Sequence, residues 1–170
     1  MFRTGSRIHP RSDLSVRVKD RGARLMVERL GAMRKASGRV VDVGIIGNEA
    51  SALHSDSTLT VAAVAAFHEL GLGVPRRSFI RDTIDQNRVD ITKTMRLLNE
   101  RVARGSLTTD QALGQLGAML VGMIQLRMAS GIAPELAPAT IAAKGSTTPL
   151  IDTGQLRSSV TSKVRNASEG

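Results

Sequence analysis

Two neighbouring segments in the middle of the chain carry apolar residues at helical spacing. In residues 79–104 they recur every three or four positions at Ile80, Ile84, Ile91, Met95, Leu98 and Val102, with Arg88 at one expected apolar position. In residues 108–130 the same spacing is formed by Leu113, Leu116, Leu120, Ile124 and Met128. Such spacing places one apolar stripe along one face of a helix. The sequence therefore predicts two helices, and the short connection around Gly105 predicts an antiparallel helical hairpin.

The second of these helices has a clear start and an unusual glycine content. Thr108 and Gln111 match a capping box, in which each side chain satisfies a backbone N–H group at the helix start. Gly114, Gly117 and Gly122 each lower helix propensity by about 1 kcal/mol relative to alanine. We therefore expect another backbone to approach this helix closely.

Two segments with residue patterns typical of β-strands lie before and after the helical hairpin in the sequence. Residues 39–47, RVVDVGIIG, are rich in β-branched residues, and residues 158–164, SSVTSKV, alternate between apolar and polar side chains. Gly44 is expected to mark a bulge in the first strand. Residues 48–58 are expected to form a loop or a further strand. The predicted fold class is α+β, with a small antiparallel sheet, helices packed on one face and the helical hairpin.

The remaining segments complete a one-domain organisation. We expect a flexible arm at residues 1–12 and an amphipathic helix after it, a short helix at 59–70 capped by Thr58 or Thr60, and a long loop at 131–149. Within that loop, residues 138–143 are expected to hold a turn of helix, and residues 150–157 a turn or short helical piece. The predicted divisions are a basic N-terminal arm and helix, 1–37, an α+β domain, 38–165, and a tail, 166–170.

The positive charge of the chain is concentrated near its N-terminus. The formal net charge is +9; residues 1–40 hold eleven Lys/Arg and three acids, while the other 130 residues hold thirteen bases and twelve acids. A segment with this excess suits a polyanion or an acidic protein surface. A solvated helix face rich in arginine is the alternative interpretation.

Aromatic and cysteine residues are scarce. The chain has three Phe, no Tyr, no Trp and no Cys. Because aromatic side chains usually supply the largest buried areas, we expect modest stability of the monomer and substantial burial between subunits. No disulfide or thiolate chemistry is available. No continuous apolar run reaches the length of a membrane span, and the N-terminus lacks a signal-peptide pattern, so no membrane partner is expected.

Motifs that carry catalysis are incomplete in this sequence. His68-Glu69 begins like a zinc-protease helix, but Leu72 occupies the position of the second histidine. Gly71-Leu72-Gly73 follows a predicted helix rather than a strand, and Arg76 replaces the third glycine of a dinucleotide-binding loop. No pair of acids is placed for acid–base work. The sequence predicts a protein that is not an enzyme and that has no cofactor and no metal site.

The segment Pro75-Arg76-Arg77-Ser78-Phe79 combines arginines with one aromatic residue. Stacking of bases on aromatic side chains beside arginine would suit a nucleic-acid site, although a single Phe is a weak signal. The favoured interpretation is that Phe79 packs inward at a helix start, while the arginines face solvent or a partner.

Two segments, residues 65–85 and 132–164, resemble the tailed-phage virion-morphogenesis and tail-completion proteins, a family that includes minor tail components. The matching residues of the first segment are Ala65, His68, Glu69, Gly71, Pro75, Arg77 and Phe79. Those of the second are Thr140, Ile141, Lys144, Gly145, Pro149, Leu150, Asp152, Thr153, Gly154, Leu156 and Ser159. Val160 stands where the family pattern has isoleucine. The resemblance covers residues 38–164 and leaves the basic N-terminal segment unmatched.

The resemblance implies a small non-catalytic α+β subunit of the virion, assembled in the host cytoplasm. Such a subunit oligomerises in the neck, between the portal-side connector and the tail terminator and tube proteins. We expect a ring with closed rotational symmetry, with six subunits favoured over twelve. Asp152-Thr153-Gly154 suits a turn that seats against a neighbouring subunit, or an ordinary turn within the chain. The residues expected at subunit or partner interfaces are Pro75, Arg76, Arg77, Phe79, Lys144, Asp152, Thr153, Gly154, Gln155 and Leu156.

The basic N-terminal segment gives a second hypothesis. Arg17, Arg21 and Arg24 are candidates for non-specific contact with packaged DNA that passes through the ring. A free, sequence-independent DNA-binding protein is the alternative from another class, but it leaves residues 132–164 unexplained.

Overall fold

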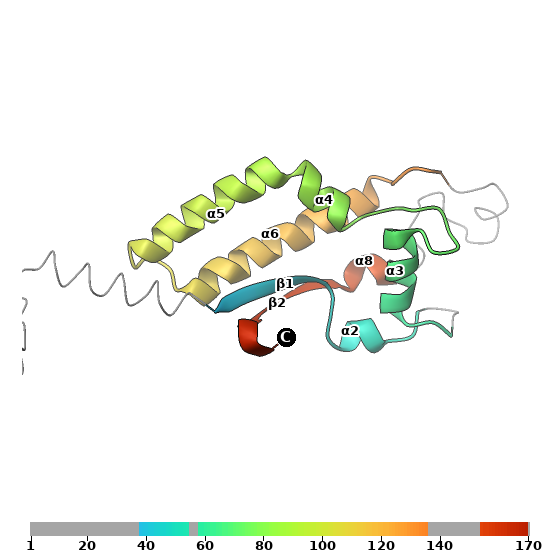
Figure 1. The fold of residues 1–170 in the computed structure, drawn as a ribbon, viewed down its shortest axis with the longest axis horizontal. Coiled ribbons are helices and arrows are strands. Elements are labelled where there is room, and N and C mark those ends of the chain that lie inside the picture. Colours follow the sequence, from blue (N-terminus) through green and yellow to red (C-terminus); the bar gives the residue numbers. More distant parts are fainter. Residues whose placement is uncertain (1–37, 55–57, 136–153, 170) are drawn as a thin grey trace, which may run out of the picture.

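The computed structural model describes residues 38–54, 58–135 and 154–169. The predicted N-terminal arm and helix, and the predicted turn of helix at 138–143, lie outside the described residues. The elements, in chain order, are β1 (Arg39–Ile45), α2 (Asn48–Ser51), α3 (Val61–Leu70), α4 (Arg81–Gln86), α5 (Arg88–Ala103), α6 (Thr109–Ala129), α8 (Gln155–Ser158), β2 (Val160–Asn166) and the 3-10 turn η1 (Ala167–Glu169). The fold is α+β, as predicted (Figure 1).

The sheet consists of β1 and β2 in antiparallel pairing. The register runs from Arg39 opposite Asn166 to Ile45 opposite Val160. This ladder is continuous and pairs Gly44 with Thr161, so the bulge predicted at Gly44 is wrong. The second strand begins and ends two residues later than predicted, because residues 155–158 form a helical turn.

Two further segments, at residues 48–51 and 166–169, also differ from the sequence-based expectation. Residues 48–51 form the short helix α2 rather than a strand, and the only strand-like contact near them among the described residues is a bridge between Leu53 and Thr60. The described part of the expected tail, residues 166–169, is also structured, because Asn166 ends β2 and the carboxylate of Glu169 accepts hydrogen bonds from Asn166.

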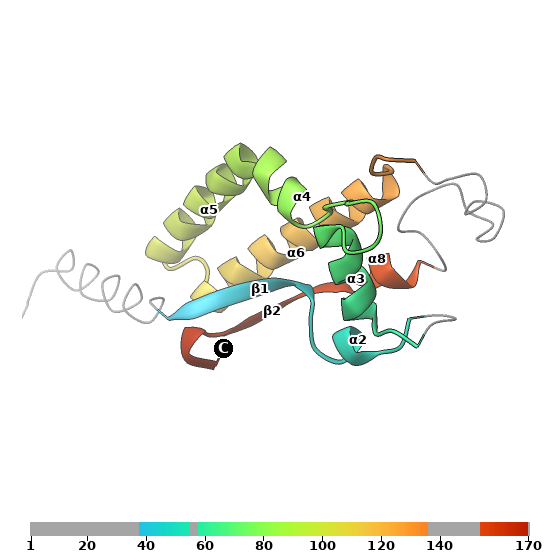
Figure 2. The same cartoon turned by 45° about the vertical axis from the view of Figure 1, so that its right-hand side comes forward.

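Helix α6 lies along the sheet, and α5 runs back over α6 (Figures 1 and 2). The predicted capping box of α6 is confirmed: Thr108 Oγ1 accepts from Gln111 N at 3.1 Å, and Gln111 Oε1 accepts from Thr108 N at 2.9 Å. Gly117 makes the expected close approach, because a Cβ there would lie 2.7 Å from Ser162 Oγ and 2.9 Å from Val41 Cγ2. Gly114 and Gly122 do not share this role, since a Cβ at either would meet nothing within 4 Å.

The segment predicted as one helix from 79 to 104 is broken at Asn87 into α4 and α5. Asn87 ends α4 by donating from its backbone N at 3.1 Å and its side-chain Nδ2 at 2.8 Å to Thr83 O. The next residue, Arg88, is exposed and pairs with Asp85 at 3.0 Å rather than filling the apolar stripe. The break therefore coincides with the polar residue that interrupted the sequence pattern.

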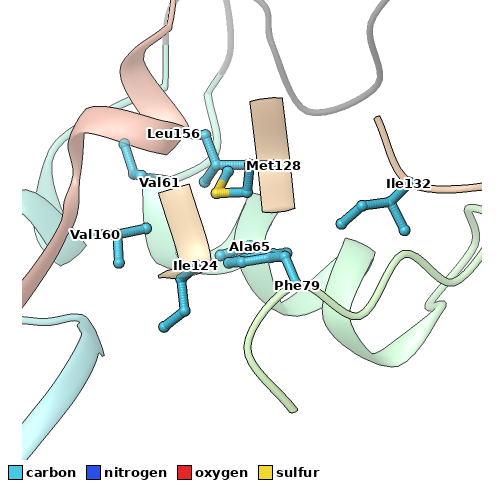
Figure 3. Packing of buried hydrophobic residues seen from close by; sticks show 8 residues of the cluster. All are labelled: Val61, Ala65, Phe79, Ile124, Met128, Ile132, Leu156 and Val160. Carbon is cyan, nitrogen blue, oxygen red and sulfur yellow. The ribbon is translucent and has the colours of Figure 1, made fainter. Parts of the chain in front are cut away.

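Two groups of buried residues form the core. The first lies where α3, α6, α8 and β2 meet and contains Val61, Ala65, Phe79, Ile124, Met128, Ile132, Leu156 and Val160 (Figure 3). The second lies between α5, α6 and β1 and contains Leu98, Ala112, Leu116 and Leu120. Val43 packs against both groups, so the sheet joins them. Phe79 is the one aromatic residue buried among the described residues.

Helix α6 is long and apolar enough, by length and composition alone, to cross a membrane. The core helix of a soluble protein passes the same test. Six α6 residues are buried inside the chain, and five of them, including Leu116, Leu120 and Ile124, belong to the two groups of core residues. This packing gives α6 the features of a core helix.

Candidate partner-binding site

Glu69, near the end of α3, caps the start of α4. Its Oε2 accepts from Phe79 N at 2.8 Å and Ile80 N at 3.0 Å, and its Oε1 accepts from Arg81 N at 2.9 Å and Ser78 Oγ at 2.7 Å. The first N–H groups of a helix have no partner inside the helix, and a negative charge suits that end. A side chain eleven residues earlier thus supplies the cap that Ile80, the residue before α4, does not provide.

The environment of Glu69 keeps its carboxyl group ionised. Burial by itself would raise the pKa of this carboxyl. The hydrogen bonds from Ile80, Ser78, Arg81 and Phe79 outweigh that effect and hold the pKa below its ordinary value. Glu69 is therefore a structural anion at neutral pH.

The loop between α3 and α4 turns back sharply at Gly71. This residue has a left-handed conformation with φ 76°, and a Cβ there would lie 2.9 Å from Arg76 Cβ. Glycine suits both the positive φ and the close approach. Arg77 N then donates to His68 O at 2.7 Å, which holds the returning loop beside the end of α3.

Arg77 is buried, with 3% of its surface exposed. Its guanidinium donates to Pro134 O at 3.0 Å from Nε and 2.7 Å from Nη2, and to Glu135 O at 3.4 Å. The expectation that this side chain faces solvent or a partner is wrong, because these carbonyl groups beyond the end of α6 satisfy its charge. The inward packing predicted for Phe79 is confirmed, with 0% exposure. Arg77 and Phe79 therefore lie beneath the exposed surface of the α3–α4 loop and are not part of that surface.

Arg127 links α6 to the same region. It donates to Gln86 Oε1 at 2.8 Å, to Asp82 Oδ2 at 3.2 Å and to Ser78 O at 3.4 Å. Arg127 was not predicted from the sequence, and Glu69 was singled out only as part of an incomplete metal motif and of the family resemblance, without a structural role. The available signal was a single arginine within an otherwise apolar stretch near the end of α6.

The described part of the second segment that resembles the tail-completion family, within residues 132–164, packs against the first segment, residues 65–85. Leu156, at 3% exposure, lies in the same buried cluster as Phe79 (Figure 3). Gly154 has a left-handed conformation with φ 77°, as expected for a glycine turn, and Gln155 Nε2 donates to Leu53 O at 2.9 Å. Leu156 is thus a core residue rather than an exposed contact.

Several predicted site residues cannot be placed in the same way. Lys144, Asp152 and Thr153 lie outside the described residues, and so do Arg17, Arg21 and Arg24.

The exposed part of this region is an apolar loop surface with one positive charge. We name Leu70, Leu72, Pro75 and Arg76 the α3–α4 surface; Leu70 is 56% exposed and Leu72 is 52% exposed. Beside it, a pocket of about 260 Å³ is lined by residues of β1, α3 and the start of α4: Ile45, Ala62, Ala65, Ala66, Glu69, Leu70, Phe79 and Ile80. Exposed leucines next to a buried, hydrogen-bonded layer are suited to binding another protein. Among the described residues, no group of three His, Cys, Asp or Glu could hold a metal ion.

Comparison of the chain with protein-family models, with curated proteins and with solved structures found no match.

Proposed function

We propose that this chain is a structural virion protein of a tailed bacteriophage. In this proposal it forms a ring at the head–tail junction, where it completes the tail or joins it to the head. Its neighbours in the neck are the portal-side connector on one side and the tail terminator and tube proteins on the other.

One observation carries the proposal: the two segments that resemble the tail-completion proteins form a single unit. Glu69, Arg77 and Phe79 of the first segment and Leu156 of the second take part in one hydrogen-bonded and apolar cluster. These four of the described motif residues each have a defined structural task, which supports the proposal. The cluster supports an exposed apolar surface, which is the kind of surface that a neighbouring virion protein would contact.

The direct test is averaged electron-microscopy imaging of intact particles, with this chain located by fitting. The expected result is ring density between portal and tail, with six subunits. A companion experiment removes the protein during infection, which should leave filled heads and separate tails. Normal infectious particles without the protein would contradict the proposal.

The charge distribution favours one additional activity, contact with DNA. Residues 1–40 hold eleven of the 24 Lys and Arg residues. Binding of this kind should weaken steeply as salt increases, because each phosphate contact releases counterions. Replacing Arg17, Arg21 and Arg24 by Gln should reduce both the affinity and the salt dependence. Unchanged DNA binding by the triple variant would exclude these arginines.

A free DNA-binding protein, acting outside the virion, is the competing function. It would bind DNA without regard to sequence and would be missing from purified particles. The presence or absence of this protein in purified particles therefore distinguishes the virion protein from the free DNA-binding protein. This test does not depend on which residues contact DNA.

A further inference from the structure

The two-stranded sheet has two strand edges without a described partner. β1 and β2 pair with each other over seven residues, and no other described strand joins them. In an antiparallel pair, alternate residues of each strand direct their N–H and C=O groups away from the partner strand. Each edge therefore offers a row of backbone donors and acceptors to a further strand.

The two faces of the sheet carry different residues. Val41, Val43 and Ile45 point toward the core, where α6 packs. Because side chains alternate along a strand, the residues between them belong to the opposite face. We name this opposite face the outer face; it contains Val40, Asp42 and Gly44 of β1 and Thr161, Lys163 and Arg165 of β2.

The outer face has opposite charges on its two strands. β1 contributes one acid, Asp42, whereas β2 contributes two bases, Lys163 and Arg165. Arg165 donates to both carboxylate oxygens of Asp42, and this hydrogen bonding lowers the pKa of Asp42. Lys163 is the exposed member of the group. The acid of the outer face therefore lies on β1, and its two bases lie on β2.

We propose that β2 of one subunit pairs with β1 of a second copy of this chain, so that the sheet continues from subunit to subunit around the ring. The strand order becomes β1-β2-β1-β2, with every neighbouring pair antiparallel. This inference rests on the ring proposed above and names the contact that would build it. A contact between two different edges is heterologous, which is the type that closes into a ring.

Charge complementarity selects this arrangement over two-fold pairing. Pairing of β2 with β1 brings Asp42 of one subunit beside Lys163 and Arg165 of the next. Pairing of two β2 edges would instead bring these bases beside their own copies, and pairing of two β1 edges would do the same for Asp42. Like charges on facing strands destabilise a sheet. An exposed lysine on a strand edge also discourages pairing with arbitrary strands, so Lys163 restricts the choice of partner to an acidic edge.

Site-specific crosslinking tests the identity of the paired edges, because the chain has no cysteine of its own. One variant carries Val40→Cys on β1, and a second, with a different affinity tag, carries Arg165→Cys on β2, because a register that places Asp42 opposite Lys163 also places Val40 opposite Arg165. The two full-length chains are co-expressed and oxidised with copper phenanthroline to form a disulfide, which requires the two Cα atoms to lie within about 7 Å of each other. A crosslinked dimer containing both tags should form in the mixture, and neither variant alone should give a dimer. A mixture of Val89→Cys and Glu100→Cys chains, whose cysteines lie on the exposed surface of α5, is the matched control and should give none.

A charge reversal tests the electrostatic part of the proposal. Lys163→Glu should weaken subunit association about tenfold or more, because it places an acid beside Asp42 of the neighbour. Lys163 also lies opposite Asp42 of its own chain, so thermal unfolding of the variant checks that its subunit remains folded. Lys93→Glu on α5 makes the same charge change at a site where Lys93 pairs with Asp90 of its own helix, and should leave association unchanged. Analytical ultracentrifugation measures both.

The possible results separate this inference from the proposed function. An oligomer with no mixed dimer, or with equal effects of Lys163→Glu and Lys93→Glu, overturns the strand pairing and leaves the ring in place. A dimer from either cysteine variant alone shows two-fold pairing and also overturns the inference. A protein that stays monomeric at high concentration and is absent from the neck of the particle overturns both.

Discussion

Glu69 accepts hydrogen bonds from three backbone N–H groups and one hydroxyl group, so its charge matters more than its size. In Glu69→Gln, an amide NH₂ replaces one carboxylate oxygen and directs a donor at other donors. We expect the free energy of unfolding at neutral pH to fall by about 2–3 kcal/mol. Urea denaturation measures the loss. Glu100→Gln removes an exposed carboxylate that pairs with Arg104, and should change stability by less than about 0.5 kcal/mol.

The same residue makes stability depend on pH. Because the folded-state pKa of Glu69 is lower than its ordinary value, its contribution is fully present above the unfolded pKa, about 4.3, and is lost as the pH falls through the folded pKa. The stability difference between the natural chain and Glu69→Gln should therefore shrink as the pH falls below about 4.3. A difference that stays constant from pH 7 to pH 3 would contradict this role.

Among single residues, those with local partners could be predicted from the sequence, and those with distant partners could not. Thr108 and Gln111 are three residues apart in the sequence and cap the start of α6 together, so their spacing predicts the capping box. Arg77 finds its acceptors 57 and 58 residues away, and no local pattern shows that an arginine in a loop will be buried. Glu69 is intermediate, because its partners follow within twelve residues but lie at the start of another helix, α4.

Gly117 fixes the distance between α6 and the sheet. A Cβ at this position would lie within 2.9 Å of atoms of both Val41 and Ser162, so Gly117→Ala must push the helix or these side chains apart. We expect Gly117→Ala to destabilise the fold by about 1–3 kcal/mol. Gly114→Ala and Gly122→Ala meet nothing within 4 Å and should each stabilise it by about 0.5–1 kcal/mol through helix propensity. Thermal unfolding of the three variants checks the opposite signs, and equal signs would show that packing does not distinguish them.

Among the helices and strands, too, the elements with a local sequence pattern were predicted, and the features without one were not. Both strands of the sheet and the α5–α6 hairpin were predicted, because apolar periodicity and β-branched residues are local signals. The break at Asn87 was not predicted, since an apolar stripe continues on both sides of it and only Arg88 interrupts the pattern. Helix α2 lacks a stripe altogether, and it has no side-chain cap.

At the scale of the molecule, the α3–α4 surface is the candidate contact with the other neck proteins. Leu72 is 52% exposed, so Leu72→Asp should change the stability of the isolated protein by less than about 0.5 kcal/mol. Incorporation of the variant into particles should fall strongly, because a buried aspartate would lack a partner at an apolar contact. Complementation of a deletion phage, with the protein quantified in purified particles, measures this. Leu97→Asp on α5, where Leu97 is 62% exposed, is the matched control and should be incorporated normally.

The small number of aromatic residues has a consequence for the whole assembly. Phe79 is the one aromatic side chain in the described core, so the isolated chain has few large side chains to bury. Association of subunits then supplies part of the stability, and mass action makes that part depend on concentration. Each tenfold rise in protein concentration should stabilise the folded state by up to about 1.4 kcal/mol per contact formed, which corresponds to a rise of roughly 2–4 °C in the melting temperature. Differential scanning calorimetry over a hundredfold concentration range measures the rise. Lys163→Glu should reduce the concentration dependence if β2 and β1 form the contact, whereas Lys93→Glu should retain it. A melting temperature independent of concentration in the natural chain would mean that the monomer holds all of its stability in the two groups of core residues.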